Sequence, residues 1–190
     1  MNSPMSPPFG LAEVPGAELV PHLPKVWIGY ILCLATFIDE GIVLSQHPEI
    51  ASGQTFLPPL HLFLLSFVTA VYWLVSIHRL HVVLSLVPGW KHPISPGRAV
   101  WFHFIPIYFL YWLYHWPEEA ANFVNWRVQR RVVQPRNAGI IVLLAYFSLF
   151  LLGPGGLALL FFALSYVVAW VARALLTPLH LPPRNNEASS

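Results

Sequence analysis

The sequence predicts an all-α integral membrane protein, and three observations lead to that prediction. Of the 190 residues, 56% are hydrophobic and only 9% are charged, whereas soluble domains carry about 25% charged residues. Mean hydropathy is +0.61, and aromatic residues make up 15% of the chain, as in proteins with much surface at membrane interfaces. Several apolar stretches approach the roughly 20 residues that a transmembrane helix needs. We therefore expect a helical bundle in a membrane.

Both ends of the chain differ from its apolar middle. Residues 1–24 are rich in proline and lack the basic start of a cleavable signal peptide, so we expect a disordered tail. Residues 178–190 are polar and predict a second disordered tail. The single cysteine, Cys33, excludes a disulfide within the chain, and a net charge of +2 offers no broad basic face for nucleic acid. The membrane domain is expected to comprise residues 25–177.

Four apolar stretches are predicted to cross the membrane. They comprise residues 25–45, 56–77, 139–152 and 157–176. The glycine- and proline-rich residues 153–156 join the last two as a tight turn, which predicts an antiparallel helical hairpin.

The aromatic segment 99–116 allows two interpretations. Positive charge precedes it, at Arg79, Lys91 and Arg98, and a second basic group follows it. Because positive charge marks the cytoplasmic side, the basic groups before and after the segment are both expected on the cytoplasmic side of the membrane. The segment would then enter the membrane from the inner face and return, or lie along the interface; the alternative is a fifth full span. With four spans, both termini are cytoplasmic and the protein lies in the inner (plasma) membrane.

Residues 117–133 predict an amphipathic interfacial helix. Pro117 suits its first turn, and Ala121, Val124 and Val128 fall on one face. Its basic end and the residues after it hold Arg127, Arg130, Arg131 and Arg136. We expect these guanidinium groups to contact anionic lipid headgroups or, alternatively, a cytoplasmic partner.

An acidic pair, Asp39-Glu40, lies inside the first apolar stretch. Carboxylates in a membrane segment are costly and usually face protein. Thr36 and Glu40 fall on one helix face, and His61 lies at a matching depth in the second stretch. We therefore predict an intramembrane polar site of Asp39, Glu40, His61 and Thr36. We interpret it as a hydrogen-bonded lock between two helices, with a proton or ion site and catalysis as alternatives.

Histidines of the inner side are candidates for binding a metal or haem. His78 and His81 share a helix face, His92 follows on the same side, and His103 and His115 belong to the aromatic segment. Zinc or haem would need further ligands at the same depth, and the spacing matches no metalloenzyme motif. No cofactor is therefore predicted, although the binding of haem, a metal or a quinone stays an alternative. No phosphate loop or nucleophile elbow occurs.

Residues 72–126 carry a recognisable motif. It consists of Ser95-Pro96-Gly97-Arg98-Ala99, then Ile105-Pro106, then the aromatic pair Tyr111-Trp112. This core resembles that of small, uncharacterised bacterial multi-span membrane proteins. The resemblance implies a multi-span fold and no particular activity.

Together these features predict a non-enzymatic multi-pass membrane protein, either an accessory or interaction subunit or a small sensor, with a basic and aromatic cytoplasmic face. Its expected partners are anionic headgroups of the bilayer and either a larger membrane complex or further copies of the chain. One alternative is a proton or ion conduit, or a transporter-like unit, using Asp39, Glu40 and His61. Another is a haem-, metal- or quinone-binding membrane protein.

Overall fold

The computed structural model describes residues 16–51, 59–152 and 156–178, and its regular elements in these ranges are all helices. The predicted all-α class is therefore confirmed. A 3-10 helix comes first and α-helices follow. Their bounds are η1 Ala17–His22, α1 Val26–Gln46, α2 Pro48–Ala51, α3 Leu60–Leu86, α4 Pro96–Trp101, α5 Tyr108–Val128, α6 Pro135–Leu152 and α7 Gly156–Leu176.

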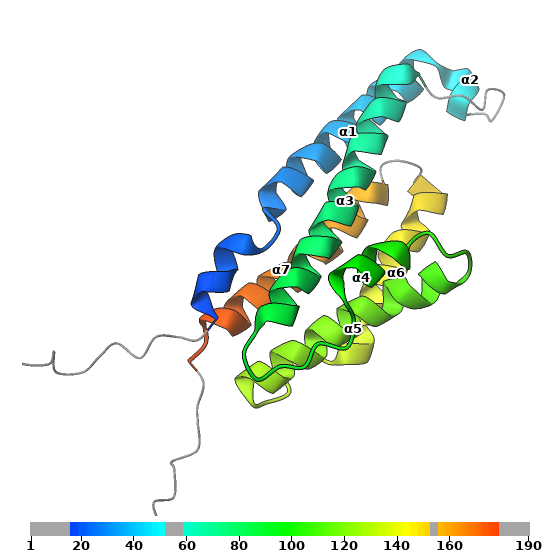
Figure 1. The fold of residues 1–190 in the computed structure, drawn as a ribbon. Coiled ribbons are helices and arrows are strands. Elements are labelled where there is room, and N and C mark those ends of the chain that lie inside the picture. The colour runs from blue at the N-terminus through cyan, green and yellow to red at the C-terminus, as the bar shows by residue number, and fades with distance from the viewer. Residues whose placement is uncertain (1–15, 52–58, 153–155, 179–190) are drawn as a thin grey trace, which may run out of the picture.

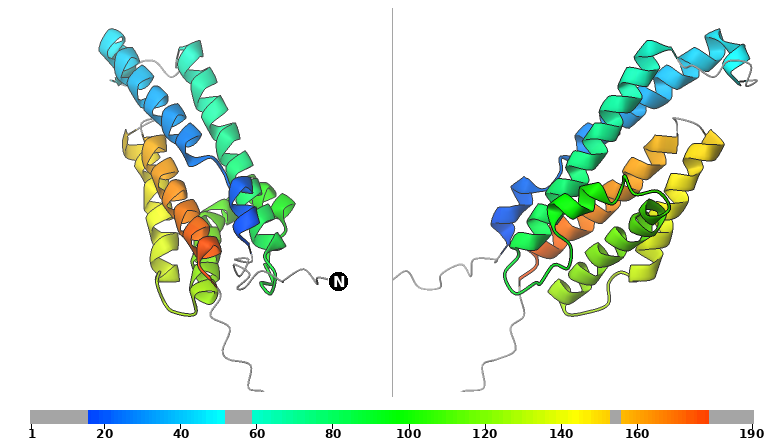
Figure 2. Two further views of the ribbon diagram at one scale, coloured as in Figure 1. Left: turned by 90° about the vertical axis from the view of Figure 1, so that its left-hand side faces the viewer. Right: turned by 45° about the vertical axis from the view of Figure 1, so that its right-hand side comes forward.

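The helices form a body and a projecting arm (Figures 1 and 2). The arm consists of α1 and the first half of α3, which lie side by side and extend past the end of the body where α6 meets α7. The body consists of η1, α4, α5, α6, α7 and the second half of α3. Since α3 belongs to both parts, it fixes their relative position.

Three helical stretches are long and apolar enough to cross a membrane: η1 together with α1, α3, and α7. This fits a membrane protein, whereas the predicted count of four spans is not confirmed, because α6 is apolar but shorter. α3 also extends to Leu86, well past the predicted end at residue 77. Leu80, Val83 and Leu84 are buried in the body, and this burial stabilises the extra turns.

The predicted disordered tail 1–24 is wrong for its last residues. These residues form η1, which packs against α3 and α7. Leu19 and Leu23 are buried there, so the segment is part of the body. The tail predictions for residues 1–15 and 179–190 lie outside the described residues.

The aromatic segment 99–116 forms parts of two helices and a turn. α4 starts at Pro96, packs against α3 and ends after six residues. The chain then turns at Pro106 and Ile107 before α5 begins. Ile107 has φ 66, which is rare for a β-branched residue and marks the point where the chain reverses.

α5 runs through Pro117, so the prediction that a helix starts there is wrong. A proline inside a helix costs about 3 kcal/mol, because it removes one backbone hydrogen bond. Trp112, Trp116 and Phe123 on the same helix are buried to 1% exposure or less. Fully burying one such side chain is worth about 1.5–3 kcal/mol, so the packing outweighs the proline.

α5 ends at Val128, before the predicted end of the amphipathic helix 117–133. Gln129 has φ 55, a left-handed conformation that ends helices. The side chain of Asn125 then holds the loop. Its carbonyl oxygen accepts two backbone N–H groups of the loop, and its amide donates to the carbonyl of Val133 at 2.7 Å. These bonds replace the helical ones that a longer helix would have made.

Two glycines bring neighbouring helices into close contact. At Gly139 of α6, an added Cβ would lie 2.5 Å from the backbone oxygen of Tyr114 in α5. At Gly29 of α1, it would lie 2.8 Å from the ring of Phe161 in α7. Small residues allow such close approach in membrane helix bundles, and any larger residue here would push the helices apart.

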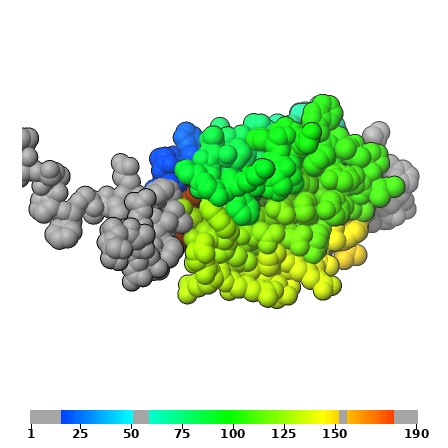
Figure 3. All heavy atoms as spheres, turned by 60° about the horizontal axis from the view of Figure 1, so that its bottom comes forward, coloured from blue at the N-terminus to red at the C-terminus, as the bar shows by residue number. Residues whose placement is uncertain are grey.

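Exposed large apolar side chains are concentrated on one half of the molecule. On α3 they extend from Leu60 to Val75, and only Leu86 follows them. On α7 they end at Tyr166, apart from Leu176. Figure 3 shows the opposite end, much of which is formed by the chain between α3 and α6. The arm and the adjoining part of the body thus have a surface of the kind that lipid covers.

Candidate functional site

The predicted intramembrane polar site lies in the arm. The Nε2 atom of His61 lies 3.4 Å from Oδ1 of Asp39, so the structure brings these two predicted residues together. The hydroxyls of Thr36 and Thr69 are 3.4 Å apart in the buried interface, and each is also 2.8 Å from a carbonyl of its own helix. Glu40 lies on the buried face of α1 and is 9% exposed.

This polar group ends partway along the interface between α1 and the rest of the molecule. Toward the body, the next buried residues of α1 are Cys33 and Gly29. Gly29 lies against the apolar ring of Phe161, and the Cys33 thiol is 3.6 Å from a backbone carbonyl of α7. The arrangement therefore suits a lock between helices better than a proton path, which would need polar groups over a greater depth.

The candidate histidines do not converge on one point, although the rings of His81 and His92 are neighbours. His78 is exposed, whereas His81 is buried. His103 lies against α3, and His115 lies 3.4 Å from Glu118 of its own helix. Within the described ranges, no group of three or more His, Cys, Asp and Glu side chains could hold a metal ion. The geometry therefore offers no support for the open metal alternative.

His81 belongs to a buried aromatic cluster. Its Nδ1 lies 2.9 Å from the carbonyl of Ile77, and its ring centroid is 5.1 Å from His92 and 5.5 Å from Trp112. Nε2 of His81, both ring nitrogens of His92 and the indole N–H of Trp112 have no hydrogen-bond partner in the part of the chain that the structure describes. Burial lowers the pKa of His92 to about 4, so this imidazole is neutral near pH 7.

The prediction that Arg127 contacts lipid headgroups is wrong, because its side chain is 1% exposed. Its guanidinium donates to the carbonyls of Ala174 at 3.3 Å and Thr177 at 3.4 Å. These carbonyls lie at the end of α7, where a cation complements the helix dipole. The Ala174 carbonyl also accepts the backbone N–H of Thr177. Arg127 therefore caps α7. The other predicted headgroup ligands, Arg130, Arg131 and Arg136, are exposed.

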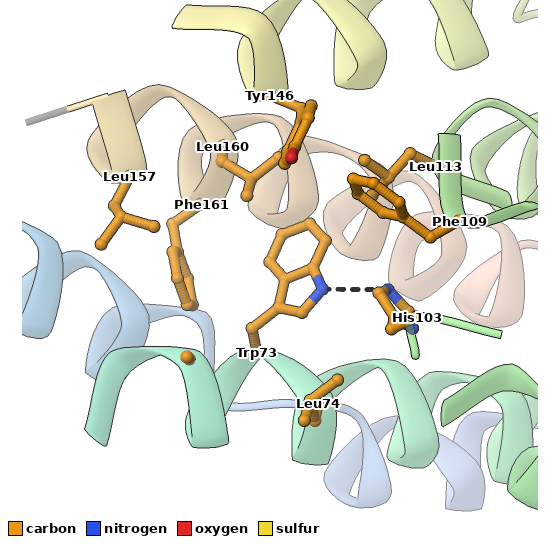
Figure 4. A pocket seen from close by; sticks show the side chains of 10 residues that line it. Trp73, Leu74, His103, Phe109, Leu113, Tyr146, Leu157, Leu160 and Phe161 are labelled. Atoms are coloured by element: carbon orange, nitrogen blue, oxygen red, sulfur yellow. Dashed lines mark hydrogen bonds between the residues drawn. The ribbon is translucent and has the colours of Figure 1, made fainter. Parts of the chain in front are cut away.

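A pocket that sequence reasoning missed lies where α3, α5, α6 and α7 meet (Figure 4). Its volume is about 210 Å³. Most of its lining is aliphatic or aromatic, and the residues that line it are Ala70, Trp73, Leu74, His103, Phe109, Leu113, Tyr146, Leu157, Leu160 and Phe161.

Trp73 and His103 form one wall of this pocket. The indole N–H of Trp73 donates to Nε2 of His103 at 3.1 Å, and Nδ1 of His103 donates to the carbonyl of Ala99 at 3.0 Å. Both imidazole nitrogens are therefore engaged, which leaves none for a metal or haem iron. Trp116 and Phe161 hold the Trp73 ring by edge contacts, with centroids 6.0 and 5.5 Å away.

Tyr146 of α6 and Phe109 of α5 line another wall. Their rings meet edge to face with centroids 5.0 Å apart. Figure 4 shows the Tyr146 hydroxyl on the side of Leu160, above the Trp73 ring. The pocket thus combines aromatic walls with one hydroxyl group that can orient a polar atom of a ligand.

The pocket is reached from the apolar part of the surface. Ala70, which lines it, is exposed. Phe67 lies one turn away on the same helix and is 59% exposed, and Ile105, before α5, is 44% exposed. A molecule dissolved in the bilayer could therefore enter without crossing a polar surface.

No protein-family model matches the chain, and neither does any curated protein or solved structure. The resemblance of residues 72–126 to small bacterial membrane proteins therefore stays a prediction. In the structure this motif supplies the start of α4, the turn before α5 and the first turns of α5. None of the motif's residues lines the pocket, although the carbonyl of Ala99 accepts a hydrogen bond from His103, which does. The function must therefore be argued from the geometry of the pocket.

Proposed function

We propose that this protein is a non-enzymatic multi-pass membrane protein that binds an apolar ring compound of the bilayer in the pocket between α3, α5, α6 and α7. The supporting observation is an aromatic cavity of about 210 Å³ that opens on apolar surface. Binding would make the protein a small sensor, which is one of the roles that the sequence predicts.

Three properties of the pocket define the class of ligand. Trp73, Phe109 and Phe161 present aromatic rings, which favour a planar ligand. The volume suits a ring of benzoquinone or naphthoquinone size better than a haem. The Tyr146 hydroxyl can donate to one ligand carbonyl. A quinone head, with its isoprenoid tail in the lipid, meets all three conditions.

The sensor role rests on α5, which joins the pocket to the basic end of the body. Phe109 and Leu113 line the pocket from the first turns of this helix. Arg127, near its other end, caps α7, and Arg130 follows in the exposed loop. Because helices move as rigid elements, we expect a ligand that shifts the start of α5 to shift this loop as well.

The proposal places the membrane around the arm and the adjoining part of the body. α1 and α3 cross it completely, and the turn between α4 and α5 enters from the basic side and returns. Trp101, Phe104 and Ile107 support this placement, because they cover the turn and are 60–85% exposed. Such exposure of apolar groups is tolerable in lipid and costly in water. Both termini then lie on the basic, cytoplasmic side of an inner (plasma) membrane.

A proton or ion conduit using Asp39, Glu40 and His61 is the second proposal. The observation that favours it is the 3.4 Å contact between Asp39 and His61 in a helix pair with an apolar surface. Ionisable pairs on membrane helices occur in proton relays, and this pair lies at the start of α3, with the His61 side chain 61% exposed. The two proposals concern different parts of the molecule and can be tested separately.

Ligand binding in the pocket is tested by blocking the pocket entrance with a larger side chain. We expect a short-tailed quinone to quench the tryptophan fluorescence of the purified protein saturably, and we expect Ala70→Phe to abolish saturation. Val71→Phe is the matched control, since Val71 is an exposed neighbour on the same helix outside the pocket. Tyr146→Phe should weaken binding about five-fold, the value of one hydrogen bond. Equal, unsaturable quenching of all these proteins would refute the proposal.

A further inference from the structure

Two adjoining hollows lie where the ends of α5 and α7 meet. Their volumes are about 320 and 230 Å³, and both are lined by Val128, Arg130 and Thr177. Trp170 and Arg173 line the second hollow as well. The hollows thus form one continuous depression with guanidinium groups on it and apolar walls beside them.

The charges on this depression are positive. Arg130 and Arg173 are exposed, and neither forms an ion pair within the described part of the chain. Arg127 borders the first hollow, but it is committed to the carbonyls of α7. The acid that interacts with Arg127 is Glu18 of η1, which does not line either hollow. Two cations are therefore available to a ligand.

The exposed face of α7 leads from apolar surface into this depression. Phe162 and Tyr166 are 59% and 48% exposed, and the Tyr166 ring lies 4.4 Å from that of Trp170. Arg173 follows one turn later. The order along the helix is aliphatic or aromatic, then Tyr and Trp, then Arg, which matches the order of acyl chain, glycerol region and phosphate in a phospholipid.

We propose that this depression binds the headgroup of one anionic phospholipid, with Arg130 and Arg173 on the phosphate. Guanidinium groups suit phosphate oxygens because they can donate two parallel hydrogen bonds. The acyl chains would follow Tyr166 and Phe162 toward an apolar groove of about 460 Å³ between α1 and α7. This groove is lined by Tyr30, Cys33, Leu34, Phe37, Ala158, Leu159 and Phe162.

A membrane lipid is the source of phosphate that the surface favours. A soluble phosphate would use only the two arginines, whereas a lipid also covers the exposed apolar side chains of α7. The lipid site lies at the opposite end of α5 from the quinone pocket. Failure of one proposal therefore leaves the other intact.

The test uses the full chain in phosphatidylcholine nanodiscs that contain phosphatidylglycerol brominated on its acyl chains. Bromine quenches the fluorescence of nearby tryptophan. The difference in quenching between the wild type and Trp170→Phe therefore reports lipid next to Trp170. We expect stronger quenching by brominated phosphatidylglycerol than by brominated phosphatidylcholine. Arg173→Gln and Arg130→Gln should each lower this preference about five-fold, the factor that one cation contributes near an anionic surface.

Arg98→Gln is the matched control, because Arg98 is exposed on α4 and does not line the depression. Arg173→Lys should lose less of the preference than Arg173→Gln, because it keeps the charge but not the two parallel hydrogen bonds. Unchanged thermal unfolding shows that the variants are folded. An equal loss in Arg98→Gln, no preference in the wild type, or displacement by inorganic phosphate would each overturn the proposal.

Discussion

The arm and the body arrange their side chains in opposite ways. In the arm, large apolar side chains such as Phe37 and Phe67 point outward, at 57% and 59% exposure, and the threonine pair is inside. In the body, Trp112 and Trp116 are inside at 1% exposure or less, and charged residues such as Arg131 are outside. The two regions thus suit different solvents, lipid for the arm and water or headgroups for much of the body.

The change occurs along α3 itself. Val75 is the last of the nearly continuous series of exposed apolar residues on this helix, and His78 and Arg79 are exposed directly after it. Because a helix rises 1.5 Å per residue, the change occupies only about one turn. One helix therefore combines a surface that suits lipid with a core element of the body.

The largest expected contrast concerns core packing. Trp112→Ala in the body should destabilise the protein by about 4 kcal/mol, because a fully buried aromatic side chain leaves a cavity. Phe37→Ala in the arm should change stability by less than about 0.5 kcal/mol, since lipid contacts the side chain in both states. Unfolding in mixed micelles with increasing denaturing detergent measures both. Equal losses would mean that the arm is packed against protein.

The second contrast concerns the arginines. Arg127→Gln should cost about 3 kcal/mol, because the buried carbonyl of Ala174 and the half-buried carbonyl of Thr177 lose a charged donor. Arg131→Gln, on the exposed loop, should stay within about 0.5 kcal/mol. The same unfolding assay compares them. If Arg127→Gln behaves like Arg131→Gln, Arg127 does not cap α7.

These residues also show what the sequence can predict. The Asp39–His61 contact was accessible, because both residues stand out in apolar stretches and their depth follows from counting helix turns. The burial of Arg127 was not, since a basic cluster on a helix end has the same pattern whether it meets lipid or a neighbouring helix end. Only tertiary packing distinguishes the two cases.

The pocket could not be predicted from the sequence for a related reason. Its walls come from four helices, and its key contact joins Trp73 to His103 across 30 residues. Local periodicity reports which face of a helix is apolar and does not report which helices meet. Pro117 was misleading in the same way, because the burial of Trp112 and Trp116 overrides a local signal for a helix start.

Acidification should weaken the body through His92. Burial lowers its pKa to about 4, against an ordinary value of 6.5, and the ring of His81 faces it from α3 at 5.1 Å. The unfolded chain therefore binds a proton that the folded protein excludes, so stability is full above pH 6.5 and falls as the pH drops toward 4. We expect about 1 kcal/mol less stability at pH 5 than at pH 7.5, after allowance for partial exposure.

Thermal unfolding at the two pH values measures this loss, and His92→Asn should reduce it. His47→Gln is the control, because His47 is exposed beside Glu49. The same pH dependence in the wild type and in His92→Asn would assign the effect to another group.

The smallest effect is expected in the arm, where it decides between a lock and a conduit. Asp39→Asn should change stability by about 0.6 kcal/mol or less, because interhelical polar contacts in membranes are weak and the amide can still hydrogen-bond His61. Proton flux into proteoliposomes should equal that of empty liposomes for both the wild type and Asp39→Asn. Flux in the wild type that disappears in Asp39→Asn would instead establish the conduit. In that case the polar residues of the arm would be functional, and their interruption at Gly29 and Cys33 would have to be bridged by water.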